Sequence, residues 1–415
     1  MRDLFDKIKE NRGPIGQHAK DAHNYFTFPK LEGNIGNRMI FRGKEQIVWS
    51  LNNYLGIGNH PEVRKTDAEA AEKYGLALPM GARMMSGNSN FHEQLENKLS
   101  DFVKKPDTIL VNYGYQGMIS AIDSLTDRHD VIVYDAESHA CIVDGVRLHL
   151  GKRFAYAHND IDNLEKQLER ATRIVKETNG SILVITEGVF GMRGDQGKLK
   201  EIVALKSKYK FRFFVDDAHG IGTMGANGGG TGEEQNCQDG IDIYFGTFAK
   251  AFALIGAFIS SEEQIVEYLR YNMRSQIFAK SLPMPMVIGA LKRLELMQKH
   301  PEFREKLWMI TRALQSELKK TGFNIGNTSS PVTPVYLSGS IAEATNIIFD
   351  LRENYNIFCS MVVYPVVPKG IIILRLIPTA VHTLDDVKKT IEAFSKIKDK
   401  LTRGEYMTEK IASVN

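Results

Sequence analysis

Short apolar runs alternate with amphipathic stretches between residue 51 and about residue 285 of the chain. The runs at 108–111, 131–134, 182–185, 211–215 and 241–245 are rich in β-branched and aromatic residues. Runs of this length and composition are typical of buried strands. The stretches between them, at 95–102, 161–176 and 199–209, place apolar residues at helical spacing. This alternation predicts an α/β fold in which a mostly parallel sheet is covered by helices on both faces.

The two ends of the chain have a different pattern. Residues 1–50 predict a helix followed by a short hairpin-like arm. Beyond residue 285 we expect a helix over 286–318 that is interrupted near Pro301, strands at 332–337, 357–364 and 371–376, and helices at 342–355 and 384–401. The chain is therefore predicted to have three parts: a helix and arm at 1–50, a large domain at 51–285 and a smaller α+β domain at 286–415. The glycine-rich segment 228–232 is expected to be a mobile loop near the site.

Two of the predicted strands end in residues that carry chemistry. The run 211–215 leads into Asp216 and His219, and the run 241–245 leads into Thr247 and Lys250. If these strands are neighbours in a parallel sheet, their carboxyl ends bring an acid, an imidazole and an amine to one crevice. Taken singly, the lysine would be interpreted as a surface charge and the aspartate as a helix cap. Together they suit a pyridine aldehyde cofactor, which needs an amine for its carbonyl carbon, a carboxylate for its ring nitrogen and an imidazole near its ring oxygen.

The amino-acid composition argues against several classes of function. The 53 basic and 50 acidic residues nearly balance, and no basic block is present, which argues against nucleic acid as a partner. The 3 cysteines are far apart, so we expect neither a disulfide framework nor a metal site, and a cytoplasmic location. Residues 1–20 lack the apolar core of a signal peptide. The longest apolar stretch, at 251–259, is far shorter than the roughly 20 residues that span a bilayer. Peripheral membrane contact stays open.

Several motifs in a fixed order resemble those of a known group of enzymes. They are Asn52–Gly56, Gly81–Arg83 with Gly87 and His92, Asp135–Asp144, His158–Asp160, Glu187–Phe190, Val215–Gly220, Gly246–Lys250, and Arg375 with His382 and Thr383. Over nearly its whole length the chain is similar to the α-oxoamine synthases, which belong to the type I fold of pyridoxal 5′-phosphate enzymes. It looks most like the bacterial serine palmitoyltransferases or a cysteate-using relative. The resemblance implies a mostly parallel seven-stranded sheet in the large domain, with a smaller α+β domain at the carboxyl end.

The resemblance implies a role for each residue around the cofactor. Lys250 is expected to bind it covalently and, once freed by the amino acid, to remove the α-proton. Asp216 would keep the ring nitrogen protonated, His139 would stack on the ring, and His219 would approach the ring oxygen. Four further residues are expected near the cofactor phosphate. Gly114 and Tyr115 open a helix, Thr247 follows a strand, and Ser281 is expected to come from the other subunit.

The resemblance also implies two residues that bind the substrate carboxylate. Arg375, in the small domain, matches the family arginine that holds this group, a task that suits a planar bidentate guanidinium. Asn53 is expected to approach the same carboxylate from the partner subunit. The protein would then be a homodimer with shared active sites.

The segment 187–195 departs from the family pattern at two positions. Relatives commonly have serine at the position of Gly191 and an acid at that of Arg193. Exchanging an acid for arginine alters the local charge by two units and favours an anionic group nearby. Lys280 adds a cation in a region that lies close to the cofactor in relatives. Both cations could instead face solvent or the cofactor phosphate. If they face the substrate, they predict cysteate, with its sulfonate, in place of serine.

The implied reaction is a decarboxylative condensation of a small amino acid with a fatty acyl thioester. The α-carbon attacks the thioester, carbon dioxide leaves, and a 2-amino ketone results, as in the synthesis of sphingoid or sulfonolipid bases. Coenzyme A and acyl carrier protein are both possible donors. The alternatives are an α-oxoamine synthase that uses glycine or alanine, an aminotransferase of the same fold, and a non-catalytic partner subunit. The last is disfavoured because Lys250 is present.

Overall fold

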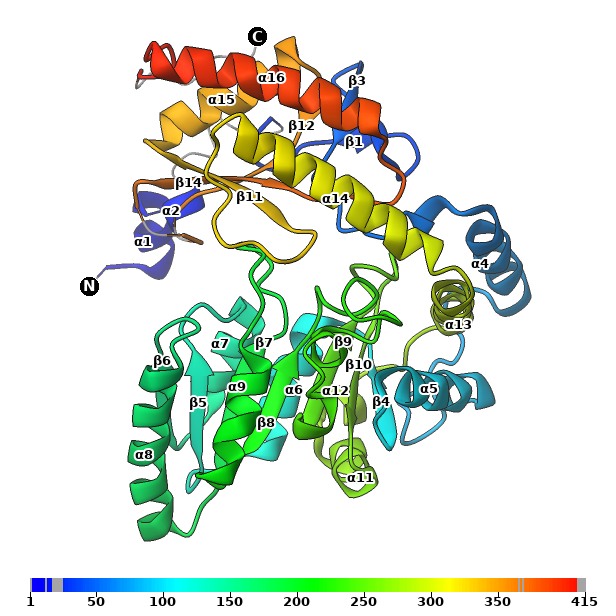
Figure 1. Ribbon diagram of the computed structural model, residues 1–415. Helices are drawn as coiled ribbons and strands as arrows, with labels where there is room; N and C mark the ends of the chain where they lie inside the picture. The colour runs from blue at the N-terminus through cyan, green and yellow to red at the C-terminus, as the bar shows by residue number, and fades with distance from the viewer. Residues whose placement is uncertain (1, 12, 17–24, 365, 368, 409–415) are drawn as a thin grey trace. The chain divides into compact units, whose positions relative to one another are not determined.

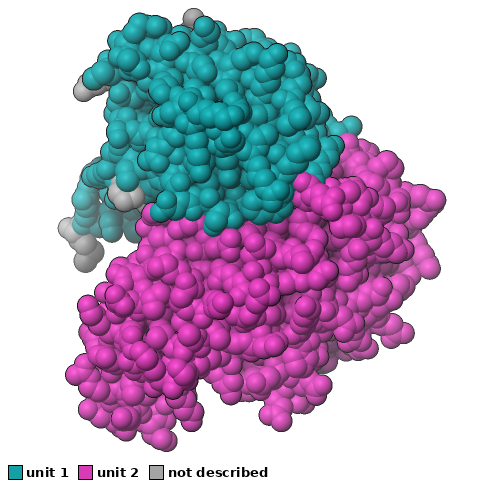
Figure 2. All heavy atoms as spheres, in the orientation of Figure 1, with its two compact units in different colours: residues 1–51, 306–415 teal, residues 52–305 magenta. Residues whose placement is uncertain are grey.

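The computed structural model describes residues 2–11, 13–16, 25–364, 366–367 and 369–408 (Figure 1). The described residues group into two compact units: residues 52–305 form one, and residues 1–51 together with 306–415 form the other (Figure 2). Of the residues predicted to form the site, Arg375 lies in the second of these units and the others lie in the first. The division into three domains remains a prediction.

The unit of residues 52–305 is built around one large sheet. Within the described chain, this sheet has 7 strands in the order β4-β10-β9-β8-β7-β5-β6. Its strands are β4 (Asp107–Val111), β5 (Val131–Asp135), β6 (Lys152–Tyr156), β7 (Ile182–Glu187), β8 (Arg212–Asp216), β9 (Ile243–Thr247) and β10 (Ala257–Ser261). β10 runs antiparallel to β4 and β9, whereas β5, β6, β7, β8 and β9 pair in parallel. The predicted mostly parallel sheet is confirmed.

The central strands are apolar along their length because helices cover both faces of the sheet. Every residue of β7 and of β9 is buried. The apolar runs in the sequence correctly predicted β4, β5, β7, β8 and β9. They missed β6, whose Lys-Arg-Phe-Ala-Tyr sequence is largely exposed at the sheet edge. They also missed β10, which overlaps the end of the apolar stretch 251–259 and begins directly after Gly256.

Helices connect and cover these strands (Figure 1). They are α4 (Pro61–Tyr74), α5 (Asn90–Val103), α6 (Gly114–Leu125), α7 (Ala140–Leu148), α8 (Ile161–Thr178), α9 (Leu199–Ala204), α10 (Thr231–Glu234), α11 (Glu263–Asn272), α12 (Arg274–Ile277) and α13 (Met284–Lys299). α6, α7 and α11 share one apolar cluster with the sheet. α8 packs on β5, β6 and β7 through Leu164, Leu168 and Ala171, and Asp160 caps its first turn.

The other unit combines both ends of the chain. Its amino-terminal part contains α1 (Leu4–Glu10), α2 (Gly13–Gly16), β1 (Leu31–Glu32), β2 (Arg38–Phe41) and β3 (Lys44–Val48). Its carboxyl-terminal part contains α14 (Glu302–Lys320), β11 (Thr333–Ser338), α15 (Ile341–Asn354), β12 (Ile357–Phe358), β13 (Ser360–Val362), β14 (Ile371–Leu376) and α16 (Leu384–Thr402). The two parts are joined because β3 pairs in parallel with β12. The Trp49 indole adds a second link, since it stacks on His382 and donates to the Thr390 hydroxyl.

Two predictions for this region have different outcomes. The interruption of the long helix is confirmed, because α13 ends at Lys299 and α14 begins at Glu302, on either side of Pro301. The single strand predicted at 357–364 is wrong. Its residues divide between β12, which pairs with β3, and β13, which pairs with β14 in a different sheet. Among the described residues, no helix is both long and apolar enough to cross a bilayer.

Candidate active site

The carboxyl ends of β8 and β9 meet as the sequence predicted. The two strands are parallel neighbours, and Asp216 is the register partner of Phe245. Lys250 follows three residues after the end of β9 and is half-buried. Its positive charge acts on two other predicted residues, because it lowers the pKa of Asp216 and that of His139. The amine of Lys250, the carboxyl group of Asp216 and the imidazole of His139 therefore share one electrostatic environment.

Asp216 is a buried carboxyl group that is suited to a cationic partner. Only 4% of the residue is exposed. Its Oδ1 accepts a hydrogen bond from the backbone N–H of Ala218 at 3.1 Å, and the Cys141 thiol lies 3.8 Å from Oδ2. Burial raises the pKa of Asp216 to about 6, against the lowering effects of the Ala218 N–H and Lys250. A carboxylate in this setting gains from a charged N–H donor.

His139 caps the start of α7 and presents an open imidazole. Its backbone N–H donates to Glu187 Oε1 at 2.6 Å, and its Nδ1 lies 2.9 Å from the Cys141 sulfur. The residue itself is exposed. Desolvation by neighbouring protein atoms, and then the charge of Lys250, lower the pKa of His139. A neutral imidazole with an open face is suited to stacking on an aromatic ring.

His219 is fixed more tightly than His139. The residue is 7% exposed, and its Nδ1 lies 2.8 Å from the Tyr54 hydroxyl. On its other side the imidazole lies against Gly191, where a Cβ atom would be only 2.3 Å from Nε2. Tyr54 lies inside the motif Asn52–Gly56, but nothing in the sequence indicated that it is a partner of His219. The His219 ring can therefore take this position because Gly191 has no side chain.

The predicted phosphate residues lie at the start of α6. Gly114 and Tyr115 are the first two residues of this helix. A Cβ on Gly114 would lie 3.3 Å from the Thr247 hydroxyl oxygen, so the hydroxyl adjoins the helix start. Thr247 also donates to the Gly256 carbonyl at 3.2 Å. Backbone N–H groups at a helix start, together with a hydroxyl, form an arrangement that favours a phosphate.

Ser281 and Lys280 lie in a neighbouring segment. The Ser281 backbone N–H donates to the Gly81 carbonyl at 2.9 Å. Its buried hydroxyl has no hydrogen-bond partner in the part of the chain that the structure describes. The exposed Lys280 amine lies 3.4 Å from the Met80 sulfur. Their predicted roles toward cofactor and substrate remain predictions.

Arg193 is engaged in an ion pair at the protein surface. Its guanidinium donates to both carboxylate oxygens of Glu137, at 2.7 and 2.8 Å. Both side chains are 42% exposed. Glu137, which lies two residues before His139, therefore partly offsets the two-unit change in charge that was predicted from Arg193.

The two residues predicted to hold the substrate carboxylate are each buried. Asn53 is 6% exposed, and its Oδ1 accepts from the Gly58 N–H at 3.1 Å. Arg375 is also 6% exposed and lies in β14, opposite Pro334 of β11 and Ser360 of β13. Because they belong to different units, their joint action remains a prediction.

The glycine-rich segment 228–232 is not a mobile loop, and that prediction is wrong. Its residues are buried. Asp217 fixes the segment by accepting from the Thr231 N–H at 2.6 Å and from the Thr231 hydroxyl at 2.7 Å, and it also binds the Tyr244 hydroxyl at 2.8 Å. Burial raises the pKa of Asp217 to about 6. Asp217 therefore acts on the fold of this loop, whereas its neighbour Asp216 faces the site.

A histidine between two acids fixes the loop that carries Gly191 and Arg193. His158 Nδ1 lies 3.0 Å from Asp135 Oδ1, and Nε2 lies 2.8 Å from Asp195 Oδ2. Burial lowers the pKa of His158, but the hydrogen bonds and charges of the two acids outweigh it and raise the pKa to about 9. The sequence placed His158 in a motif but gave no sign of its two partners.

This triad predicts a pH-dependent stability. Because the folded pKa of His158, about 9, exceeds the unfolded value of about 6.5, the stabilisation is full below pH ~6.5 and is lost as pH rises through ~9. We expect His158→Gln to lower the urea midpoint at pH 6.5 and to remove most of the fall seen in the wild type between pH 6.5 and 9.5. His300→Gln, at an exposed histidine paired with Glu302, should keep the wild-type slope. Equal slopes for the wild type and His158→Gln would contradict the prediction.

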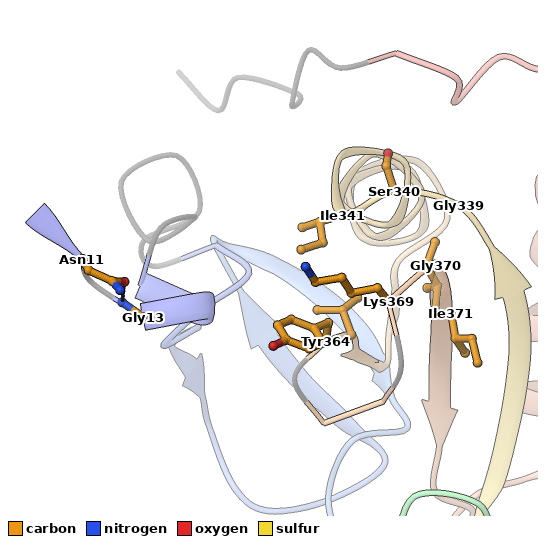
Figure 3. A pocket seen from close by; sticks show the side chains of 11 residues that line it. Asn11, Gly13, Gly339, Ser340, Ile341, Tyr364, Lys369, Gly370 and Ile371 are labelled. Atoms are coloured by element: carbon orange, nitrogen blue, oxygen red, sulfur yellow. Dashed lines mark hydrogen bonds between the residues drawn. The ribbon is translucent and has the colours of Figure 1, made fainter.

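A separate hollow lies in the unit of residues 1–51 and 306–415. This cavity, of about 530 Å³, is bounded by Asn11 and Gly13, the start of α15 and the start of β14 (Figure 3). Ser340, Tyr364 and Lys369 are among its lining residues. None of the predicted site residues contributes to its described lining. The residues that were predicted to carry the chemistry therefore do not meet in this cavity.

Comparison with known proteins agrees with this geometry. The family described as aminotransferase class I and II matches residues 44–394. A cysteate-C-fatty acyltransferase from Capnocytophaga ochracea is 60% identical over 406 residues, which cover 98% of this chain and 97% of that protein. A serine palmitoyltransferase from Sphingobacterium spiritivorum is 32% identical over 383 residues, covering 92% of this chain and 94% of that protein. A solved serine palmitoyltransferase from S. paucimobilis, with bound PLP and myriocin, has a TM-score of 0.89 at 30% identity and covers 97% of this chain and 100% of its own.

Proposed function

The chain belongs to the aminotransferase class I and II family, and from that premise we propose that it condenses cysteate with a fatty acyl thioester in a decarboxylative, pyridoxal 5′-phosphate-dependent reaction. The observation that carries the proposal is the 60% identity over nearly the full length to a cysteate-C-fatty acyltransferase, against 32% to a serine palmitoyltransferase. The resemblance to α-oxoamine synthases found in the sequence is confirmed by the same relatives. The product would be a 2-amino ketone that carries a sulfonate, a precursor of sulfonolipid bases.

The residues of this chain fit the cofactor. A buried carboxyl with a raised proton affinity, Asp216, suits the protonated ring nitrogen. The open imidazole of His139 suits the ring face, and the start of α6 beside Thr247 suits the phosphate. His219 would approach the ring oxygen. Lys250 would bind the aldehyde carbon. When bound, the cofactor supplies an electron sink that stabilises negative charge on the α-carbon of the amino acid.

The chain's own groups would handle the proton and the charges. In this proposal the Lys250 amine removes the α-proton of cysteate and carries it at Nζ. The α-carbon then forms a bond to the thioester carbonyl carbon, the carbon–sulfur bond breaks, and the thiol leaves. Breaking the bond between the α-carbon and the carboxylate releases carbon dioxide, and the α-carbon takes up a proton in its place. The proton held at Nζ and one proton from solvent together supply the α-carbon and the leaving thiolate. Asn53 and Arg375 are proposed to hold that carboxylate before it leaves, and Arg193 and Lys280 to face the sulfonate.

We also propose a homodimer. Two segments of the unit 52–305 lie side by side, since the Ser281 N–H donates to the Gly81 carbonyl and the Met284 N–H to the Leu78 carbonyl. They carry large exposed apolar side chains, with Met85 82% and Phe278 77% exposed. Exposed apolar patches of this kind mark interaction surfaces. A second copy of the chain would cover this surface. A cytoplasmic location is proposed because all 3 described cysteines are free.

The reaction class can be tested by measuring the release of the thiol, coenzyme A, from the acyl thioester. With cysteate and palmitoyl-coenzyme A together, we expect stoichiometric release of coenzyme A and carbon dioxide, and little release when either substrate is omitted. With cysteate and 2-oxoglutarate, we expect no glutamate. Formation of glutamate without thiol release would instead support the aminotransferase alternative. Acyl carrier protein should be tested as donor in the same assay, because either thioester suits the chemistry.

A further inference from the structure

A buried acid that the proposed mechanism does not use joins the segments that carry the two imidazoles. Glu187 is the last residue of β7 and the register partner of Asp216 in β8. It is 5% exposed. Its Oε1 accepts the backbone N–H of His139 at 2.6 Å, and the backbone N–H of Gly191 also donates to this carboxyl. One carboxyl group therefore binds the main chain at the start of α7 and in the loop after β7.

The contact with Gly191 reaches the second imidazole by packing. A Cβ at Gly191 would lie 2.3 Å from Nε2 of His219 and 2.8 Å from Cδ2, so the ring rests directly on the Gly191 main chain. On its far side the ring is held by the Tyr54 hydroxyl at 2.8 Å. The imidazole is thus enclosed between Tyr54 and Gly191. Any displacement of Gly191 changes the room available to His219.

The loop that carries Gly191 is stiff apart from this contact. Val189 and Gln196 form an antiparallel bridge, and the Gly194 N–H donates to the Phe190 carbonyl at 2.8 Å. Asp195 is held by His158 at 2.8 Å. These contacts hold the loop together as one unit. The Glu187 carboxyl sets the position of this unit relative to the ends of β7 and β8.

We propose that Glu187 is a positioning residue for both imidazoles of the site, acting on His139 through its backbone N–H and on His219 through Gly191. Burying a carboxyl group is costly unless its hydrogen-bonding capacity is used, and here it is used on these two segments. Burial first, and then the charge of Asp216, raise the pKa of Glu187 well above its usual range. The inference rests on the proposed function.

The test compares Glu187→Ala and Glu187→Gln in the holoenzyme. For each we would measure the pH midpoint of the absorbance change of bound pyridoxal phosphate, kcat and KM, and the thermal midpoint. Glu187→Ala should shift the spectral midpoint by about one pH unit and lower kcat at least 10-fold, with KM for the acyl thioester changed less than threefold. Glu187→Gln keeps one carbonyl acceptor and should restore most of the loss. Asp350→Ala removes a buried acid of α15 with its own partners and should lower only the thermal midpoint.

A double variant tests the route of action. If Glu187 acts through the imidazoles, the effect of Glu187→Ala on kcat should be smaller in a His139→Ala background than in the wild type, because only the route through His219 then remains. A spectral midpoint equal to that of the wild type, with kcat reduced only as far as in Asp350→Ala, would overturn the proposal. If the wild type does not use cysteate, the proposed substrate fails, but the spectral midpoints still decide the role of Glu187.

Discussion

Replacement of Lys250 by alanine is expected to lower kcat by at least about 10⁴-fold, because Lys250 is proposed both to attach the cofactor covalently and to act as the base that carries the α-proton. The half-buried amine also lowers the pKa of Asp216 and of His139. Its loss should therefore raise the proton affinity of both groups. Coenzyme A release under saturating cysteate and palmitoyl-coenzyme A gives the rate.

The controls for Lys250 separate chemistry from folding. Lys166→Ala changes an exposed lysine of α8 and should keep wild-type activity. Lys250→Ala should keep a thermal midpoint within a few degrees of the wild type. A small exogenous amine such as methylamine should restore part of the lost rate to Lys250→Ala. Retention of more than about 1% of kcat by the alanine variant would exclude Lys250 as the base.

The second large effect is the choice of amino acid. We expect kcat/KM for L-cysteate to exceed that for L-serine by at least about 10²-fold. A cation placed to bind a sulfonate loses a charge-assisted hydrogen bond when a hydroxyl takes its place, and a site built for a polar group rejects an analogue that lacks it. Steady-state kinetics with each amino acid at a fixed concentration of acyl thioester measure this ratio. Comparable values for the two substrates would contradict the proposed specificity.

Arg193 gives this specificity a test on a single residue. Its guanidinium makes two hydrogen bonds to Glu137 through one nitrogen. If Arg193 faces the sulfonate as proposed, Arg193→Ala should lower kcat/KM for cysteate at least 10-fold and that for serine less than threefold. Glu137→Ala removes these two hydrogen bonds and should leave cysteate turnover intact. If Arg193→Ala lowers kcat/KM equally for both amino acids, Arg193 serves to pair with Glu137 and does not bind the sulfonate.

The sequence located most of the central residues because they follow recognisable strands. Asp216, His219 and Lys250 stand just beyond the apolar runs that became β8 and β9, and parallel neighbours necessarily present these ends at one edge. Partners distant in sequence could not be predicted in this way. The Glu187–His139 bond joins residues 48 apart, and the Arg193–Glu137 pair joins residues 56 apart. Their separation in space depends on loop conformations that periodicity does not encode.

The errors in the fold have similar causes. β10 is antiparallel and overlaps the end of an apolar stretch, where composition alone does not distinguish a strand from the residues before it. The segment 357–364 has strand composition throughout, but its two halves pair with different neighbours. The segment 228–232 has the composition of a mobile loop, yet Asp217 and Tyr244 hold it in place. In each case tertiary hydrogen bonds decide what local composition leaves open.

The most direct test of the central claim is a competition experiment. Equimolar L-cysteate and L-serine would be incubated with the holoenzyme and palmitoyl-coenzyme A, and the products would be identified by mass spectrometry. The account predicts a sulfonated 2-amino ketone, formed with one carbon dioxide and one coenzyme A per product, in at least about 100-fold excess over the ketone derived from serine. A serine-derived ketone in equal or greater amount would contradict it.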